Sequence, residues 1–131
     1  MPQHRRPPGS AADWLARARS DLAIAKAALP EEVFFEDLCF HAQQAAEKAL
    51  KAVYQHNGWA FLYTHDLEAL LSGLMRRGLS IPEEIVDADT LSRFAWQARY
   101  PSLEEPVTQE EYQQAIQIAE TVLTWASNQA Q

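Results

Sequence analysis

The chain has 131 residues, of which 47% are hydrophobic and 22% charged, as expected for one ordinary globular domain. Its single cysteine excludes a disulfide framework and a cysteine-based zinc site. The net charge of −7, from 11 basic and 18 acidic residues, argues against a large basic face for duplex nucleic acid. No apolar run approaches about 18 residues and no secretory signal opens the chain, so we expect no membrane association and a cytoplasmic location.

Residues 1–9 contain three prolines and no apolar period, which predicts a disordered tail before a single helical domain over residues 10–131. Ser10 and Asp13 form a capping pattern, so the first helix is expected to begin at Ser10 and to end at Pro30. An apolar stripe at steps of three and four supports this helix: Leu15, Ala18, Leu22, Ala25 and Leu29.

The second predicted helix covers residues 32–55 and ends at the Asn57-Gly58 stop signal. Its apolar stripe is rich in alanine, which would allow a neighbouring helix to approach closely. Residues 59–65, WAFLYTH, place aromatic side chains at alternating positions. They could form a short extended segment, but a loop whose rings pack onto the bundle or onto a second subunit is favoured.

Three further helices are predicted, each bounded by a glycine, a proline or a capping residue. The first runs from Thr64 or His65 to Gly78, and the second from Pro82 to just before Pro101. The third begins at the capping box of Thr108 and Glu111. The sequence therefore predicts an all-α fold, an antiparallel up-and-down bundle of four main helices with one extra short helix.

No metal or cofactor motif is found. The four histidines lack the Glu-x-x-His spacing of di-iron bundles, and no glycine-rich phosphate loop is present. Asp37 and His41 are four residues apart, which is more typical of a hydrogen-bonded surface pair than of a metal site. Cys39 follows Leu38 in an apolar stretch and is interpreted as a small core residue. We expect no metal and no cofactor.

A polar row on the second helix is the first candidate binding surface. His41, Gln44 and Lys48 follow one another at steps of three and four. The row could be a solvated face, with Glu47 and Lys51 forming an ordinary ion pair one turn apart, or it could be the wall of a polar groove. The solvated face is the simpler interpretation.

The second candidate is the run Arg99-Tyr100-Pro101 at the end of a predicted helix. Arg99 could satisfy the last carbonyl groups of that helix. Alternatively, Arg99 and Tyr100 offer a guanidinium group and an aromatic face, a natural pair for a phosphate and a base.

Four segments together resemble the HEPN domain family over about residues 12–127. They are the W-x7-L-x2-A pattern of Trp14, Leu22 and Ala25, CFHAQQAAEKALKA at 39–52, THDLEALL at 64–71, and RYP at 99–101. The segment at 39–52 is the specific part of the resemblance. The resemblance implies a helical bundle that commonly forms homodimers. It also implies one of two functions. One branch contains metal-independent endoribonucleases, often toxins, with an Arg-x4–6-His motif completed across the dimer. The other contains non-catalytic modules that bind nucleotides or work beside a nucleotidyltransferase partner.

The sequence departs from the nuclease branch. The positions where a histidine would follow Arg99 hold Glu104, Glu105 and Pro106, and no histidine follows Arg93 at that spacing. Without an imidazole there is no obvious group to transfer a proton near neutral pH. We therefore favour a non-catalytic module in a toxin–antitoxin-like context, and keep as the alternative a divergent endoribonuclease that uses Arg99 with Tyr100 or His41. A purely structural bundle without a ligand is the third possibility.

The expected partners are a second copy of the chain, a nucleotidyltransferase-fold protein, and a nucleotide or RNA. For a nucleotide, we expect Arg99 to hold the phosphate and Tyr100 to stack on the base. His41, Gln44 and Lys48 are the second candidates, because the resemblance places the second helix beside the Arg99 segment.

Overall fold

The computed structural model describes residues 6–27, 31–61, 63–97 and 106–131. Within these residues the regular elements are helices: α1 (Ala11–Ala25), α2 (Phe35–His56), α3 (Leu67–Arg76), α4 (Glu83–Val86), the 3₁₀ helix η1 (Asp87–Arg93), α5 (Phe94–Gln97) and α6 (Gln109–Gln129). The predicted all-α bundle is confirmed.

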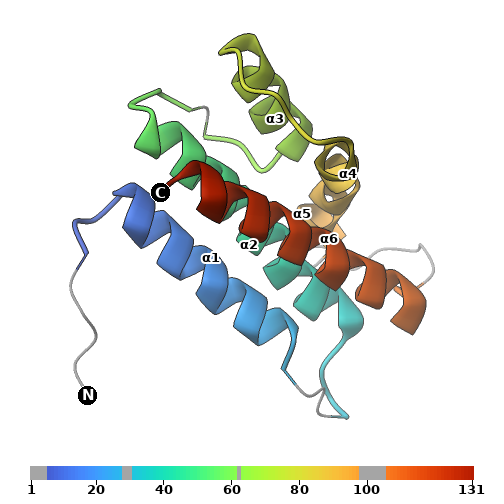
Figure 1. Cartoon of the computed structure of the whole chain (residues 1–131). Coiled ribbons are helices and arrows are strands. Elements are labelled where there is room, and N and C mark those ends of the chain that lie inside the picture. The colour runs from blue at the N-terminus through green and yellow to red at the C-terminus, as the bar shows by residue number, and fades with distance from the viewer. Residues whose placement is uncertain (1–5, 28–30, 62, 98–105) are drawn as a thin grey trace.

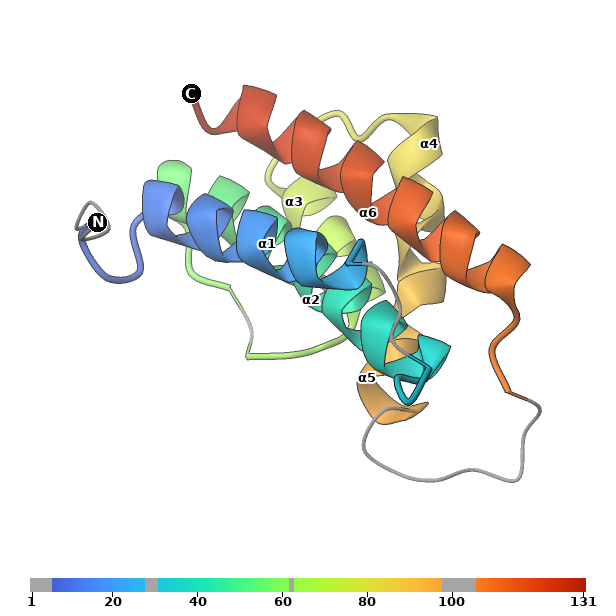
Figure 2. The same ribbon diagram turned by 90° about the horizontal axis from the view of Figure 1, so that it is seen from below.

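Helices α1, α2 and α6 lie side by side along the length of the bundle (Figure 1). α2 packs against both α1 and α6, and α1 runs antiparallel to each of them. α3, α4 and α5 pack against α2 and α6 on the side away from α1, as the view turned by 90° also shows (Figure 2). α2 is therefore the central helix, with neighbours on several faces.

Alanines of α2 explain how the helices approach so closely. Five of them are completely buried: Ala42, Ala45, Ala46, Ala49 and Ala52. Small side chains let two helix backbones come together, and each buried methyl group still adds to the apolar area removed from water. The larger core side chains come from α2, α3 and η1, and include Leu50, Leu70 and Leu91.

Capping side chains begin two of the long helices as predicted. The Ser10 hydroxyl accepts a hydrogen bond from the Asp13 amide at 3.2 Å, and the Asp13 carboxylate accepts one from the Gly9 amide at 3.0 Å. Residues 7–10 form a turn at the end of the segment predicted as a tail, and residues 1–5 lie outside the described residues. At α6, Thr108 and Glu111 form the predicted reciprocal capping box.

Three predicted boundaries are shifted. α2 begins at Phe35 rather than Glu32, and α3 begins at Leu67, with Asp66 as its N-cap, rather than at Thr64 or His65. Thr64 instead accepts a hydrogen bond from the Asp66 amide at 3.0 Å, which forms a side-chain turn just before the helix. The first helix, α1, ends at Ala25 with Lys26 as its C-cap and so stops before the predicted end at Pro30, and residues 28–30 lie outside the described residues.

The prediction of one continuous helix after Pro82 was wrong. The chain forms α4, the 3₁₀ helix η1 and α5 in succession. The reason is the spacing of the buried side chains, which are Ile85, Ala88, Leu91 and Phe94, each three residues after the last. A 3₁₀ helix has three residues per turn, so η1 keeps Ala88 and Leu91 on the face that continues from Ile85 of α4 to Phe94 of α5, whereas a continuous α-helix would rotate these side chains away from each other.

Residues 59–65 form a loop that packs two of its three aromatic rings onto the bundle, and residue 62 lies outside the described residues. Gly58, with φ of +70°, lets the chain leave α2, and the Trp59 amide then bonds the Tyr54 carbonyl at 2.9 Å. Trp59 and Phe61 pack against the core, while Tyr63 is 96% exposed. None of the described helices is both long and apolar enough to cross a membrane.

Candidate functional site

The predicted polar row of α2 is divided between two clusters. The first, the Asp21 cluster, consists of Asp21, His41 and Lys48. The Asp21 carboxylate on α1 accepts a hydrogen bond from Lys48 Nζ at 2.6 Å, and its other oxygen lies 2.9 Å from His41 Nδ1. Asp21 is largely buried between α1 and α2, whereas about a quarter to a third of the Lys48 and His41 side chains is exposed. The cluster joins the two helices.

The predicted surface pair of Asp37 and His41 is corrected by this arrangement. His41 Nδ1 bonds Asp21, which projects from the neighbouring helix. Asp37 lies in the first turn of α2, where an acidic side chain complements the partial positive charge of the helix N-terminus.

The second group, the Glu47 cluster, consists of Gln43, Gln44, Glu47, Lys51 and His65. Glu47 Oε1 lies 2.8 Å from His65 Nδ1 and accepts a hydrogen bond from Gln43 at 3.0 Å, while Glu47 Oε2 accepts one from Lys51 at 2.9 Å. Gln44 donates to Gln43 at 2.7 Å and approaches Glu47 at 3.4 Å. Every oxygen of the buried carboxylate therefore has a partner.

The electrostatics of Glu47 follow from these contacts. Burial raises the pKa of the carboxyl group, but hydrogen bonds from Lys51, His65 and Gln43 and the positive charge of Lys51 outweigh burial. The pKa of Glu47 is held below its ordinary value, so the group is a carboxylate at neutral pH. The predicted ion pair with Lys51 is present, but it is buried, so the simple solvated-face interpretation of this row was wrong for these two residues.

Aromatic rings enclose the cation of this cluster. Lys51 Nζ lies 5.5 Å from the ring centroid of Trp14 on α1 and 5.3 Å from that of Phe61 in the 59–65 loop. Trp14 and Phe61 themselves meet edge to face, with centroids 5.8 Å apart. The ammonium group interacts favourably with both ring faces, and so ties the loop to α1 and α2.

A pocket of about 540 Å³ opens beside the Glu47 cluster. Its lining residues come from the end of the 59–65 loop, the start of α3 and the end of η1: Tyr63, Thr64, His65, Asp66, Ser92 and Arg93. We call it the His65 pocket.

Histidine and arginine side chains give the His65 pocket its polar character. Since the Glu47 carboxylate can only accept hydrogen bonds, His65 Nδ1 carries a proton, and His65 Nε2 makes no hydrogen bond within the described residues. Arg93 is half exposed and pairs with Glu111 at 3.0 Å. Ser92 is engaged through its hydroxyl oxygen, which accepts a hydrogen bond from the Leu67 amide at 3.0 Å.

Cys39 is completely buried, and its predicted role as a small core residue is confirmed. Burial, together with the nearby negative charge of Glu36, raises the pKa of its thiol to about 12. A thiol of that pKa carries almost no thiolate at neutral pH and is a poor nucleophile. Across the described ranges, no three histidine, cysteine, aspartate or glutamate side chains gather closely enough to hold a metal ion.

The HEPN domain model matches this chain over residues 11–129, nearly its whole length. The chain belongs to the HEPN family. A similar solved structure is TT1696 from Thermus thermophilus, with 31% sequence identity and a TM-score of 0.80 over 91% of this chain and 97% of that one. Another is ST0689, described as an archaeal HEPN homologue, with 28% identity and a TM-score of 0.74 over 93% and 98% of the two chains. No curated protein matches the chain significantly.

The segment of this HEPN protein that carries Arg99 and Tyr100 lies outside the described residues, as do Pro101, Glu104 and Glu105. α5 ends at Gln97, two residues before Arg99. Of the five predicted site residues, the structure therefore describes His41, Gln44 and Lys48. It brings His41 and Lys48 together on Asp21 and directs Gln44 toward Glu47.

The sequence prediction missed the roles of Asp21, Gln43 and His65 and the burial of Glu47, and all of these except His65 left a faint signal. Gln43 and Glu47 are four residues apart and are flanked by the apolar Ala42 and Ala46, a sign of polar groups inside a buried stripe. Asp21 follows Ala18 by three residues and so lies on the core-facing side of α1. His65 was interpreted only as the start of a helix, and nothing in its local sequence indicates contact with Glu47.

Proposed function

We propose that this HEPN protein is a cytoplasmic, non-catalytic module that binds a nucleotide and works as a homodimer with a nucleotidyltransferase-fold partner, in a toxin–antitoxin-like pair. The non-catalytic assignment rests on the missing Arg-x4–6-His motif. The nucleotide assignment rests on the His65 pocket, which is the observation that carries the proposal.

The size and the polar groups of the His65 pocket suit a nucleotide. Its volume of about 540 Å³ falls within the range of ~300–1,000 Å³ that is typical of small-molecule sites. A guanidinium group, an imidazole and three hydroxyl groups line it, and these groups bind phosphate oxygens well. The negative charges of Asp66 and Glu111 repel a phosphate anion, so we expect the pocket to bind a nucleotide weakly.

Arg99 and Tyr100 remain the residues proposed to hold the phosphate and the base. They follow α5 by two and three residues, and η1, which contributes Ser92 and Arg93 to the pocket, directly precedes α5. His41, Gln44 and Lys48 are the second set in this proposal. A ligand would have to compete with Asp21 for His41 and Lys48, and with Glu47 for Gln44.

Calorimetric titration with nucleoside mono-, di- and triphosphates tests the His65 pocket. We expect Arg93→Gln to weaken binding about 10- to 100-fold, the value of one charge-assisted hydrogen bond. Glu111→Gln is the matched opposite change, because it removes the carboxylate that competes for Arg93 while glutamine can still complete the capping box. Tighter binding by Glu111→Gln supports the proposal, and equal affinity in all three proteins contradicts it.

The geometry also favours one second candidate, a divergent endoribonuclease. An imidazole whose Nδ1 is held by a carboxylate while Nε2 makes no hydrogen bond is the arrangement of a general base. Arg93 in the same pocket could stabilise negative charge on a phosphate. This version of the alternative uses His65 in place of His41. RNA cleavage that disappears in His65→Gln would favour it over the non-catalytic module.

A further inference from the structure

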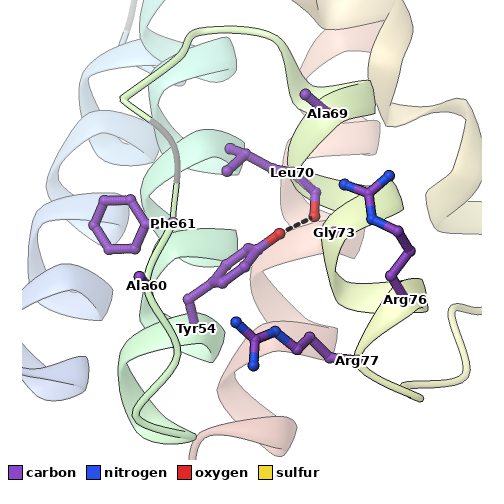
Figure 3. Close-up of a pocket in the computed structure, with 8 residues that line it drawn as sticks. All are labelled: Tyr54, Ala60, Phe61, Ala69, Leu70, Gly73, Arg76 and Arg77. Atoms are coloured by element: carbon purple, nitrogen blue, oxygen red, sulfur yellow. Dashed lines mark hydrogen bonds between the residues drawn. The ribbon is translucent and has the colours of Figure 1, made fainter.

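A second cavity, of about 230 Å³, lies between the end of α2, the loop that follows it and α3. It shares no lining residue with the His65 pocket. Figure 3 shows the side chains that define it, which include Tyr54, Phe61, Leu70, Gly73, Arg76 and Arg77. We call it the α2–α3 cavity.

The phenol of Tyr54 crosses from α2 to α3 and closes one side of this cavity. Its hydroxyl donates a hydrogen bond to the Leu70 carbonyl at 2.6 Å (Figure 3). This hydrogen bond can form because Gly73 has no side chain. A Cβ atom at position 73 would overlap the Tyr54 hydroxyl. The wall is therefore fixed by a hydrogen bond and by the absence of a side chain at position 73.

Arg76 and Arg77 supply positive charge, and within the described part of the chain no carboxylate competes for them. Five other basic side chains form an ion pair with an aspartate or glutamate: Arg17, Lys26, Lys48, Lys51 and Arg93. Neither Arg76 nor Arg77 lies within ion-pair distance of a carboxylate of the described residues, and no acidic side chain lines the cavity. In a chain of net charge −7, two adjacent guanidinium groups without an ion-pair partner among the described residues are a distinct feature.

The positive charges of both guanidinium groups affect the Tyr54 phenol, which forms one wall of the cavity. Burial raises the pKa of Tyr54, and the charges of Arg76 and Arg77 oppose that rise, which puts both within electrostatic range of the phenol oxygen. The Arg77 guanidinium lies 5.4 Å from the ring centroid of Trp59, and this cation–π contact limits its freedom before any ligand arrives.

The end of α3 does not need these side chains to cap its carbonyl groups. The Arg77 amide bonds the Gly73 and Leu74 carbonyls, the Gly78 amide bonds that of Met75, and the Leu79 amide also reaches Leu74. Backbone amides thus bond three of the last carbonyl groups of the helix, those of Gly73, Leu74 and Met75, and the side chains of Arg76 and Arg77 are left available for a ligand.

We propose that the α2–α3 cavity binds the phosphate group of a small molecule, held by Arg76 and Arg77. Guanidinium groups bind phosphate oxygens through paired, charge-assisted hydrogen bonds. The volume of about 230 Å³ lies below the ~300 Å³ at which sites for larger ligands begin, so the cavity suits a phosphate or diphosphate group rather than a whole dinucleotide. The group can be free or can belong to a nucleotide whose remainder lies outside. This site is independent of the His65 pocket.

Calorimetric titration of the full chain with inorganic phosphate, pyrophosphate, AMP and adenosine tests this inference. We expect pyrophosphate to bind more tightly than phosphate, and adenosine not to occupy this cavity. Binding of AMP that is weakened in Arg76→Gln and in Arg77→Gln shows that the phosphate in this cavity can be carried by a nucleotide. If pyrophosphate binds and AMP does not, the ligand is a free anion.

The decisive variants are Arg76→Gln and Arg77→Gln. Each should weaken pyrophosphate binding about 10- to 100-fold. The double variant Arg76→Gln/Arg77→Gln combines the two changes. Its matched control is Arg17→Gln/Arg19→Gln, because it removes two arginines of α1 from exposed positions and changes the net charge equally. Circular dichroism should report an unchanged helix content in all of them.

Several outcomes would overturn the inference. These are the absence of any pyrophosphate binding to the wild type at millimolar concentration, or an equal loss in the control and in the Arg76→Gln/Arg77→Gln protein. Loss of binding in Arg93→Gln and Arg99→Ala but not in the Arg76→Gln/Arg77→Gln protein would leave the proposed function standing and this site refuted. The reverse pattern supports this site and counts against the His65 pocket.

Discussion

The Nδ1 atom of His65 lies 2.8 Å from Oε1 of Glu47, a residue 18 positions earlier in the chain. This contact anchors the end of the 59–65 loop to the central helix, and it orients the imidazole that lines the largest of the polar pockets described above. The same carboxylate also neutralises Lys51. Glu47 therefore links the stability of the bundle to the geometry of the candidate site.

Glu47→Gln should destabilise the protein strongly. The change leaves Lys51 as a buried charge without its partner, and breaking a buried pair in this way typically costs about 3–5 kcal/mol. Urea unfolding measures the free energy directly. Glu120→Gln is the control, because it breaks the exposed pair with Lys26, for which we expect a change of at most ~1 kcal/mol. Similar losses in the two variants would contradict the role given to Glu47.

The contribution of Glu47 should depend on pH in a defined direction. Its pKa is lower in the folded protein than in the unfolded chain, so the unfolded state binds the proton more readily. The stabilisation is then complete above the ordinary value of 4.5 and is lost as the pH falls through the lower folded value. We expect the difference in free energy of unfolding between wild type and Glu47→Gln to be constant from pH 7 to about pH 5 and to shrink below. A difference in free energy of unfolding that grows as the pH falls would contradict this prediction.

Gly73→Ala should destabilise the protein, although alanine favours a helix by about 0.5–1 kcal/mol over glycine. The added methyl group would overlap the Tyr54 hydroxyl and displace the bond from that hydroxyl to Leu70. Thermal unfolding of Gly73→Ala, Tyr54→Phe and the double variant provides a double-mutant cycle. We expect the cost of Gly73→Ala to be smaller in the Tyr54→Phe background. A more stable Gly73→Ala protein would mean that the helix gain outweighs the overlap.

The purified protein should leave mixed single-stranded RNA intact, with or without a chelator. The expectation rests on the carboxylates of Glu104 and Glu105, which occupy positions where the nuclease motif would place a histidine and which repel RNA phosphates. Gel analysis of the RNA measures this. RNA cleavage by the wild type that is lost in Arg99→Ala or in His65→Gln would show that the protein is a nuclease and would contradict the prediction.

A symmetric dimer is the expected oligomeric state. Two aromatic side chains are left largely in water by the single chain: Phe34 is 69% exposed and Tyr63 is 96% exposed. Exposed apolar groups of this size are typical of interfaces, and two-fold symmetry is the commonest closed arrangement. Sedimentation equilibrium at micromolar concentration should report a dimer that Phe34→Ser or Tyr63→Ser weakens. Only monomer in the wild type would remove this claim.

The helices could be predicted because their signals are local. The capping pattern of Ser10 and Asp13 and the capping box of Thr108 and Glu111 depend on residues three positions apart, and both form as expected. The break into η1 was missed because buried residues three apart, from Ile85 to Phe94, also fit part of an α-helical stripe. Only packing against α2, α3 and α6 selects the tighter helix.

The candidate sites were harder to predict, because burial and pairing arise between distant segments. The row of His41, Gln44 and Lys48 was recognised on one helix, but its partner Asp21 lies on α1. Arg76 and Arg77 were interpreted only as the end of a helix, since the cavity beside them exists only once Tyr54 reaches α3 across Gly73. A sequence shows which side chains a helix carries, while the fold decides which charges remain without a partner.

The central claim is that this HEPN protein binds a nucleotide through Arg99. Calorimetric titration of the wild type and of Arg99→Ala with several nucleoside phosphates tests it most directly, with Arg19→Ala as a control of equal charge. The account predicts saturable binding by the wild type and the control, and a loss of about 10- to 100-fold in affinity for Arg99→Ala. Equal affinity in all three proteins, or no binding by any of them at millimolar ligand, would contradict it.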